Sequence, residues 1–365
     1  MKHECTFAVL GSGNGARAWC AQIAAKGYSV TMWEPLEATD DFRKLVARPE
    51  IRLCGDMNLG GRLANVTMKI DEAMKGADFV LIVVPSFAHE PIFRKMIPHL
   101  RDGQNVVVVP GNFAGFRLRK IMREAGVSRK ITISETASMP YACRISGFDT
   151  VTVYKRKLKL QIATSPFSFS EYVREVMNDV FDGYVEYIAS DSLLSIDCDN
   201  INYTLHPLPV LLNFGAIELN SKTFRHYIDG ITPEISERMK SMDIERVKAG
   251  SGIGLRLQEC LSQIKMYYGT NDAADIYEYV HSGESPYFDL VGQSIKSRYI
   301  TEDVPGVVVP FVQLAAKAGI ALPIAELVVG LASFLHGVDY FSSGTTLEKL
   351  GIQNLSIDDI IESSK

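Results

Sequence analysis

Two polar clusters in the second half of the chain contain residues suited to acid–base chemistry. Asn202 and His206 stand four positions apart in a helix-compatible segment, so their side chains share one face. Histidine is the usual general acid or base near neutral pH, and it needs a second group to hold its tautomer. In the second cluster, at 298–305, Arg298 can bind a carboxylate through two hydrogen bonds and Asp303 can orient an imidazole. The alternatives are purely structural roles. His206 would then be a core histidine bonded to a backbone carbonyl, and Arg298 with Asp303 would form a structural ion pair.

A glycine-rich loop near the start of the chain predicts a dinucleotide site. Residues 7–16, Phe-Ala-Val-Leu-Gly-Ser-Gly-Asn-Gly-Ala, read as a strand that leads into the pattern G-x-G-x-x-A. Gly11 allows the tight turn, Gly13 lets the backbone approach a pyrophosphate, and the small Ala16 permits close packing of the next helix. The alternative is a purely structural turn. The expected cofactor contacts are Gly11, Ser12, Gly13, Asn14, Gly15 and Ala16.

Glu34 ends the second predicted strand and favours NAD as the cofactor. It follows Gly11 at close to the roughly 20-residue offset of the acidic residue that hydrogen-bonds the adenosine ribose. A carboxylate at that position repels the 2′-phosphate of NADP. The alternatives are a solvated charge at the end of a strand, and NADP binding with Arg17 and Arg43 accommodating the phosphate.

The ends of three further strands carry residues to the same predicted edge. Doubly wound folds bind their ligands at the carboxyl edge of the sheet. We therefore expect Pro85 and Ser86 to line the ribose end of the cofactor, and Asn112 and Thr136 to meet a substrate near the nicotinamide. His89, on the following helix, is at least as well explained by packing.

The elements that must position these residues indicate an α/β fold, a doubly wound Rossmann-type parallel sheet followed by an all-α second domain. We expect the dinucleotide-binding domain to span residues 1–185 and the helical domain residues 186–365, with ligands in a cleft between them. The expected strands are Thr6–Leu10, Ser29–Trp33, Phe79–Val84, Asn105–Val109 and Lys130–Ser134, with Thr150–Tyr154 and Lys159–Ala163 extending the sheet as an added edge.

Composition limits the classes of partner. The 365 residues carry 38 Lys and Arg against 43 Asp and Glu, so the chain lacks the basic field of a nucleic-acid binder. The six cysteines form no CxxC pair, which indicates reduced, mostly buried thiols, and we expect no metal. The start of the chain does not read as a signal peptide, and prolines and charges interrupt the most apolar stretch. We expect a cytoplasmic protein with small-molecule partners, no membrane and a possible homodimer.

Several longer motifs make the chain resemble the opine dehydrogenases, in particular their bacterial N-(1-carboxyethyl)amino-acid type. The His-Pro and Arg-Tyr-x-x-Glu-Asp elements are the specific ones, since very many dehydrogenases share the glycine loop. The matching segments are Gly-Ser-Gly-Asn-Gly at 11–15, Val-Val-Pro at 83–85, Glu-Thr-Ala-Ser-Met at 135–139, Asn-x-x-x-His-Pro-Leu-Pro at 202–209, Arg-Tyr-x-x-Glu-Asp-Val at 298–304 and Thr-Leu-Glu-Lys-Leu-Gly at 346–351.

The resemblance implies a reaction and a role for each matching residue. These enzymes condense the amine of an amino acid with a 2-oxo acid, often pyruvate, and a hydride from NAD(P)H reduces the imine to a secondary amine. His206 takes the role of acid–base catalyst and Asp303 orients it. Arg298 holds the carboxylate of the oxo acid, and Thr136 contacts the oxo acid. Asn202 and Asn112 complete the expected substrate contacts; relatives differ at the position of Asn112.

Two other classes remain as alternatives. Dehydrogenases of the glycerol-3-phosphate or ketopantoate type use a catalytic lysine, whereas no lysine lies between Asp191 and Lys222. A non-catalytic NAD-binding sensor would not need the set of His206, Arg298 and Asp303. The residue pattern leaves the amino-acid partner open, with Tyr267, Tyr268 and the segment 277–287 as weak candidates for its pocket.

Overall fold

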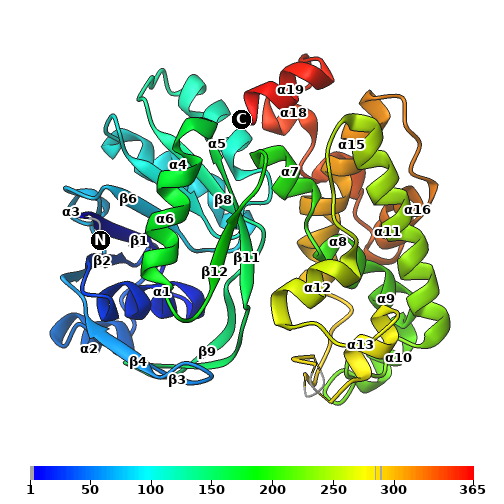
Figure 1. Cartoon of the computed structure of the whole chain (residues 1–365), viewed down its shortest axis with the longest axis horizontal. Helices are drawn as coiled ribbons and strands as arrows, with labels where there is room; N and C mark the ends of the chain where they lie inside the picture. Colours follow the sequence, from blue (N-terminus) through cyan, green and yellow to red (C-terminus); the bar gives the residue numbers. More distant parts are fainter. Residues whose placement is uncertain (1–3, 284, 288–289) are drawn as a thin grey trace. The chain divides into compact units, whose positions relative to one another are not determined.

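The computed structural model describes residues 4–283, 285–287 and 290–365, and the chain forms two compact units (Figure 1). Unit 1 comprises Met1–Ile196 with Ser364–Lys365, and unit 2 comprises Asp197–Ser363. The boundary expected between residues 185 and 186 lies just before the strand Glu186–Ala189, which pairs within unit 1.

Unit 1 is built on an eight-stranded sheet of Rossmann type, which confirms the predicted fold class. The strand order is β12-β11-β8-β7-β6-β1-β2-β5, and the six strands from β5 to β8 in this order run parallel. Because the chain leaves β1 first toward β2 and later toward β6, the strand order reverses beside β1, and sheets of this kind bind their ligands at the carboxyl edge next to that point. The strands are β1 Thr6–Leu10, β2 Ser29–Trp33, β5 Asn65–Thr67, β6 Phe79–Ile82, β7 Asn105–Val108, β8 Thr132–Thr136, β11 Lys159–Ser165 and β12 Glu186–Ala189.

A second, four-stranded sheet accompanies the first, and it corrects one prediction. The predicted strand at Thr150–Tyr154 exists, but it lies in this second sheet and does not extend the main one. It pairs with the preceding strand, Tyr141–Gly147, and with the remote strand Glu50–Gly55, and the local pattern could not reveal the second of these pairings. Lys159–Ser165 does join the main sheet, antiparallel to β8. The order is β4-β3-β10-β9, with β3 Glu50–Gly55, β4 Leu59–Arg62, β9 Tyr141–Gly147 and β10 Thr150–Arg156.

The first helix, α1 (Asn14–Ala25), is enclosed by the two sheets. It contacts β1 and β2 of the main sheet and β3, β4 and β9 of the second. All eight residues from Ala16 to Ile23 are therefore buried, including the indole of Trp19. A helix that is buried on every side is held rigidly, so the glycine loop before it has a fixed support.

The other helices of unit 1 connect these strands. They are α2 Asp40–Ala47, α3 Ile70–Met74, η1 Ser86–Ala88, α4 His89–Met96, η2 Ile97–His99, α5 Ala114–Glu124, η3 Phe167–Phe169, α6 Ser170–Val180 and α7 Leu193–Cys198, the last of which crosses into unit 2.

The regular secondary structure in the described part of unit 2 consists of helices, as predicted. Its longest helix, α11, ends at Gly254, whose positive φ of 97° suits glycine. The helices are α8 Asn202–Leu205, α9 Pro207–Leu212, α10 Phe214–Asn220, α11 Pro233–Ile253, α12 Cys260–Tyr268, α13 Ile276–His281, α14 Arg298–Thr301, a π-helical turn η4 Val304–Val308, α15 Val309–Lys317, α16 Pro323–His336, α17 Tyr340–Ser343, α18 Leu347–Leu350 and α19 Ile357–Ser363.

Three global expectations can be compared with the structure. All six cysteines are free thiols, and every one except Cys54 is buried, as predicted. Among residues 4–283, 285–287 and 290–365, no group of three or more His, Cys, Asp or Glu side chains is arranged around a metal position. Over the same residues, no single helix is long and apolar enough to span a membrane; one pair, Pro323–His336 with Tyr340–Leu350, bent by 104°, meets the length and composition criteria jointly.

Candidate active site

His206 stands at a break between two short helices of unit 2. It follows the last residue of α8 and directly precedes Pro207, the first residue of α9. Proline cannot continue a helical hydrogen-bond ladder through its nitrogen, but it is well suited to the first turn of a new helix. The break therefore places the imidazole at a helix junction rather than along a continuous face.

One side of the His206 ring is fixed by a carboxylate. Nδ1 of His206 lies 2.7 Å from Oδ2 of Asp303, and both side chains are about nine-tenths buried, at 10% and 7% exposure. The amide of Asn202 donates to the other oxygen of Asp303 at 3.3 Å. A carboxylate in this position accepts from an Nδ1–H, so the neutral ring has its lone pair on Nε2. The structure thus brings together three of the predicted residues.

Asp303 is itself placed by an irregular piece of helix. The π-helical turn η4 starts directly after Asp303 and contains Pro305, which lacks the N–H that a regular α-helix requires. Single π-turns within helices are frequent at functional sites. Here the wider turn separates the short helix α14 from α15 and lets Asp303 face His206 from the junction.

The other side of the His206 ring is occupied by two tyrosines. The hydroxyl of Tyr227 lies 3.0 Å from Nε2, and the ring of Tyr299 stacks on the imidazole with centroids 3.6 Å apart and planes 5° apart. The two tyrosine hydroxyls are 3.3 Å from each other. Burial holds the pKa of the Tyr227 phenol well above its ordinary value, so it is protonated at neutral pH.

A second histidine lies beside this group and is held neutral. Nε2 of His226 is 3.0 Å from the carbonyl of Leu205, and its Nδ1 is 3.2 Å from Nε2 of Gln293. Burial, assisted by the nearby His206, lowers the pKa of His226 to about 3. With both ring nitrogens engaged and the ring neutral, His226 is a packing and hydrogen-bonding residue, whereas His206 faces groups that can exchange a proton.

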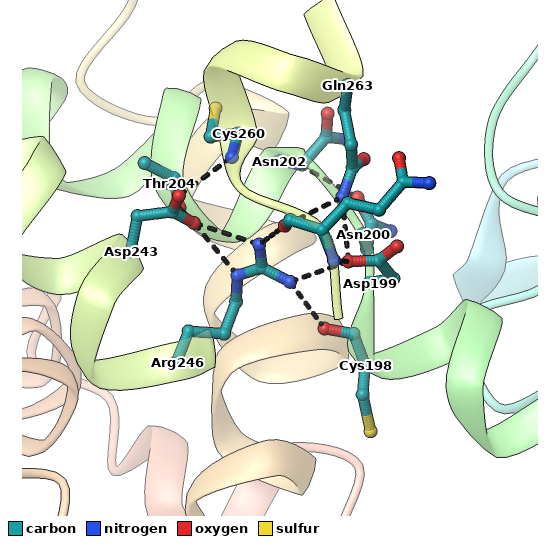
Figure 2. Close-up of polar contacts among 10 residues, drawn as sticks. Cys198, Asp199, Asn200, Asn202, Thr204, Asp243, Arg246, Cys260 and Gln263 are labelled. Carbon is teal, nitrogen blue, oxygen red and sulfur yellow. Dashed lines mark hydrogen bonds and ion pairs between the residues drawn. The ribbon is translucent and has the colours of Figure 1, made fainter. Parts of the chain in front are cut away.

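A buried charge network anchors the segment that leads to His206 (Figure 2). The guanidinium of Arg246, on α11, pairs with Asp243 at 2.9 Å and with Asp199 at 3.0 Å, and it also donates to the carbonyl of Cys198. Asp243 in turn accepts the hydroxyl of Thr204 at 3.0 Å. The backbone on both sides of Asn202 is therefore tied to α11.

The charges of this network stabilise one another. Burial alone would lower the pKa of Arg246, but the two carboxylates together raise it above its ordinary value. Burial raises the pKa of Asp199 to about 6, against the opposing effect of Arg246. The Gln263 amide and the N–H of Gln258 also donate to Asp199, at 2.7 and 2.8 Å.

Arg298 lies on the exposed side of unit 2. Its side chain is 67% exposed, and Nη1 stands 3.5 Å from the Glu302 carboxylate one helical turn away. The alternative of a structural ion pair between Arg298 and Asp303 is therefore not what the structure shows. Arg298 pairs with Glu302, and Asp303 pairs with His206. An exposed guanidinium in a long, weak pair can reorient toward an incoming carboxylate at low cost.

The glycine loop of unit 1 fits a dinucleotide. Gly11 adopts a φ of +128°, and a Cβ there would meet the Val83 carbonyl at 2.6 Å. Among the described atoms none lies within 4 Å of a Cβ added at Gly13, the N-cap of α1, so the backbone there is open to a ligand. Since glycine has no side chain to cap a helix, the first N–H groups of α1 can bind phosphate oxygens.

Two further loop residues support the structure around that opening. The side chain of Asn14 accepts the N–H of Ile145 at 2.8 Å, so its oxygen is used by β9. The buried Arg17 donates to the carbonyls of Ser12 and Phe148. Both side chains support the loop, and the backbone and the side-chain NH₂ group of Asn14 remain for a cofactor.

Glu34 follows β2 and contacts the glycine loop. The hydroxyl of Ser12 donates to one carboxylate oxygen of Glu34, and the N–H of Leu36 donates to the other at 2.8 Å. Burial raises the pKa of the Glu34 carboxyl, and the Leu36 contact and Arg17 partly offset the rise. The carboxylate is thus held beside the loop, the geometry expected of a ribose-binding acid.

The remaining predicted residues of unit 1 lie on the same edge of the sheet. Pro85 and Ser86 follow β6, and Ser86 begins the turn η1, where its carbonyl accepts from Arg117 at 3.3 Å. Asn112 follows β7, is buried, and has a φ of 55°, a left-handed conformation that asparagine tolerates better than most residues. Non-glycine residues in this region are more frequent at ligand sites than elsewhere.

Thr136, the last residue of β8, belongs to a braced turn. Its hydroxyl donates to the carbonyl of Ser138 at 2.9 Å. The ammonium of Lys157 donates to the hydroxyl of Ser138 at 3.2 Å and to the carbonyl of Met139 at 2.7 Å. Burial lowers the pKa of Lys157 to about 7. The side chain of Met139 lies directly against Gly15, so this turn and the glycine loop support each other.

Comparison with known proteins gives the same picture for both units. The family described as "NAD/NADP octopine/nopaline dehydrogenase, alpha-helical domain" matches residues 189–336. The family described as "NAD-dependent glycerol-3-phosphate dehydrogenase N-terminus" matches residues 6–131. An opine dehydrogenase of Arthrobacter sp. (strain 1C) is 33% identical over 98% of this chain and 98% of its own length. The chain belongs to the opine dehydrogenase family.

More distant members of the opine dehydrogenase family show how far its sequences diverge. The vitopine synthase of Allorhizobium ampelinum is 24% identical over 94% of this chain and 95% of its own length. A solved octopine dehydrogenase with NADH and L-arginine has a TM-score of 0.80 at 20% identity, covering 99% of this chain and 98% of that one. The fold is thus shared along the whole chain.

Sequence reasoning assigned no role to three of the groups around His206 in this opine dehydrogenase, Tyr227, His226 and Tyr299. Tyr227 and His226 lie in the segment Thr-Phe-Arg-His-Tyr at 223–227, which matches none of the motifs used. Tyr299 stands inside the Arg-Tyr-x-x-Glu-Asp element, and only its position there could have drawn attention to it. Of the weak pocket candidates, Tyr287 stacks on Tyr227 with centroids 4.2 Å apart, and Tyr268 packs edge-on against Tyr287.

Proposed function

We propose that this opine dehydrogenase condenses the amine of an amino acid with a 2-oxo acid and reduces the resulting imine to a secondary amine. The observation that carries the proposal is the buried His206–Asp303 pair, at 2.7 Å, in a helical unit that matches the opine dehydrogenase domain. A non-catalytic NAD-binding sensor would not need an imidazole that is oriented by a carboxylate. The acid–base group is a histidine, where the glycerol-3-phosphate and ketopantoate types would require a lysine.

The dinucleotide is held by unit 1 in this proposal. The backbone of the glycine loop and the start of α1 bind the pyrophosphate, Glu34 binds the adenosine ribose, and Pro85 with Ser86 lines the other ribose. The bound reduced nicotinamide supplies the hydride that reduces the imine. Glu34 favours NADH over NADPH because a 2′-phosphate would meet its carboxylate.

His206 moves the protons that the condensation requires. An amine attacks a carbonyl carbon only when it is neutral, so His206 first accepts a proton from the substrate ammonium. Loss of water then needs a proton on the departing hydroxyl, and the imidazolium returns it. Asp303 stabilises the imidazolium and keeps Nδ1 protonated, while Asn202 holds Asp303 in place. Arg298 binds the oxo-acid carboxylate, and Thr136 and Asn112 contact the oxo acid.

The proposal is tested by assaying NADH oxidation with pyruvate and a pool of common amino acids, and by measuring product masses in the same reaction. The expected product has the summed mass of amino acid and pyruvate, less water and plus two hydrogens. Reduction of pyruvate alone to its hydroxy acid would contradict the proposal. So would tight NADH binding with no oxidation for any amine offered with several 2-oxo acids.

Replacing Glu34 by alanine should narrow the preference for NADH over NADPH. Removing a carboxylate that faces a phosphate relieves a repulsion that we expect to be worth about tenfold or more in relative kcat/KM. The measurement is the ratio of kcat/KM for the two cofactors. The matched control is Glu171→Ala, which removes an exposed carboxylate from α6 of the same unit and should leave the ratio unchanged. An unchanged ratio in the Glu34 variant would exclude a ribose contact.

Replacing Arg298 by alanine should raise the KM for pyruvate by about 10-fold to 100-fold, the usual worth of a charge-assisted hydrogen bond to a carboxylate. Arg298→Lys should raise the KM for pyruvate less than Arg298→Ala does. Lysine keeps the positive charge but lacks the planar guanidinium that forms two parallel hydrogen bonds with a carboxylate. The control is Arg238→Ala, which removes an exposed guanidinium from α11 of unit 2. A KM for pyruvate equal to that of the unmodified enzyme would leave Arg298 with only its Glu302 contact.

A further inference from the structure

The nitrogen of His206 that must exchange protons does not face open space. Its lone pair on Nε2 lies in the plane of the ring, and the Tyr227 hydroxyl lies 3.0 Å from this nitrogen. The ring of Tyr299, stacked at 3.6 Å and nearly parallel, covers one face of the imidazole. A substrate atom that took the place of the Tyr227 hydroxyl would have to displace a ring that is buried and stacked on Tyr287.

The hydroxyls continue outward from this nitrogen as a chain. Tyr227 donates to Nε2 of the neutral ring, and the Tyr299 hydroxyl stands 3.3 Å from the oxygen of Tyr227. Tyr227 is buried, whereas Tyr299 is partly exposed. The order is therefore Asp303, His206, Tyr227, Tyr299, from the buried end to the accessible end.

We propose that protons reach and leave His206 through the hydroxyls of Tyr227 and Tyr299, so that Tyr227 relays protons for the acid–base catalyst. When the substrate ammonium gives up a proton, its N–H bond breaks and the proton binds the oxygen of Tyr299. The Tyr299 proton passes to the oxygen of Tyr227, and the Tyr227 proton passes to Nε2. Both phenols end as they began, one imidazolium is formed, and no electrons are transferred. The return path delivers the proton for the loss of water.

The surroundings of Tyr227 favour proton transfer through its hydroxyl over the formation of a stable phenolate. Burial and the neighbouring tyrosines hold the pKa of Tyr227 well above its ordinary value, so no phenolate accumulates between the two transfers. Stacking on Tyr287 and on the edge of His226 fixes the Tyr227 ring, which keeps the oxygen in line with Nε2. A hydroxyl is the simplest group that can donate and accept at once.

The first test follows the hydrogen bond itself and needs no substrate. In the full chain, the ¹⁵N chemical shift of His206 Nε2 should show an accepted hydrogen bond and should move toward that of a free imidazole nitrogen in Tyr227→Phe. Tyr340→Phe is the matched control, because it removes a phenol 2.9 Å from Nδ1 of another histidine of unit 2, His336. It should change only His336. A His206 shift that is the same in Tyr227→Phe as in the unmodified protein would overturn the proposal.

The second test rests on the proposed function and uses pyruvate with the amine that the product assay identifies. In mixtures of H₂O and D₂O, kcat/KM of the unmodified enzyme should fall as the fraction of D₂O rises. The plot of kcat/KM against that fraction should be curved, because more than one proton moves in the same step. Tyr227→Phe should lower kcat by about 10-fold to 100-fold, within the range of acid–base effects, and give a straight line. Tyr340→Phe should match the unmodified enzyme.

The outcomes of the two tests separate the relay from the proposed function. Unchanged kcat and an unchanged curve in Tyr227→Phe would contradict the relay while the opine activity stood. If the product assay fails but the ¹⁵N shift responds to Tyr227→Phe, the proposed function falls and the hydrogen-bond chain remains. A kcat loss in Tyr227→Phe with the curve unchanged would assign Tyr227 a structural role and reject the relay.

Discussion

His206→Ala should lower kcat by at least about 10²-fold while the affinity for NADH stays nearly unchanged. The size follows from the usual contribution of a general acid or base to the rate. NADH binding is expected to survive because the glycine loop and Glu34 belong to unit 1, whereas His206 belongs to unit 2. Steady-state assays give kcat, and fluorescence titration gives the dissociation constant of NADH.

His206→Gln separates chemistry from folding in this prediction. Removing the imidazole leaves the buried Asp303 with only its contact to the Asn202 amide, so the alanine variant can also lose activity through instability. A glutamine amide can donate to Asp303 yet cannot carry a proton near neutral pH. We expect His206→Gln to keep the thermal transition of the unmodified protein and to lose kcat like the alanine variant. A kcat within about threefold of the original would remove His206 from the mechanism.

The core of the Rossmann-type sheet was predictable because its strands are short, largely buried and, apart from Thr132–Thr136, rich in apolar residues. Thr6–Leu10 and Ser29–Trp33 end where predicted, and the next three strands lie within two residues of the prediction. In the second sheet only the strand at Thr150–Tyr154 was predicted, and its membership of a separate sheet was not. Leu59–Arg62 contains two glycines, and its packing on α1 compensates for their weak strand propensity.

The candidate site, like the fold, was predictable only in part. The pairing of His206 with Asp303 spans 97 residues of sequence, yet residue types alone suggested it, because an imidazole needs an acceptor to fix its tautomer. Tyr227 also contacts His206, and nothing in its neighbourhood indicated this. A phenol is an ordinary core residue, so only the fold can show where its hydroxyl points.

Arg246→Met should destabilise unit 2 by about 3–5 kcal/mol, the typical cost of breaking a buried ion pair by removing one partner. The Arg246 guanidinium is fully buried and pairs with both Asp199 and Asp243. Methionine fills a similar volume but leaves two buried carboxylates without a cation. Both tryptophans, Trp19 and Trp33, belong to unit 1. Urea unfolding followed by far-ultraviolet circular dichroism should therefore shift more than unfolding followed by tryptophan fluorescence.

The pH dependence of this loss identifies its cause. Without Arg246, the folded-state pKa of Asp199, which burial already raises, lies still further above its unfolded value, so the penalty is absent where this carboxyl is protonated and grows as pH increases. The difference in stability between Arg246→Met and the unmodified protein should thus be largest near pH 7 and shrink toward pH 4. Adding Asp199→Asn and Asp243→Asn should restore much of the loss, because the unpaired charges are then gone. A loss that is independent of pH and is not restored would attribute the effect to packing.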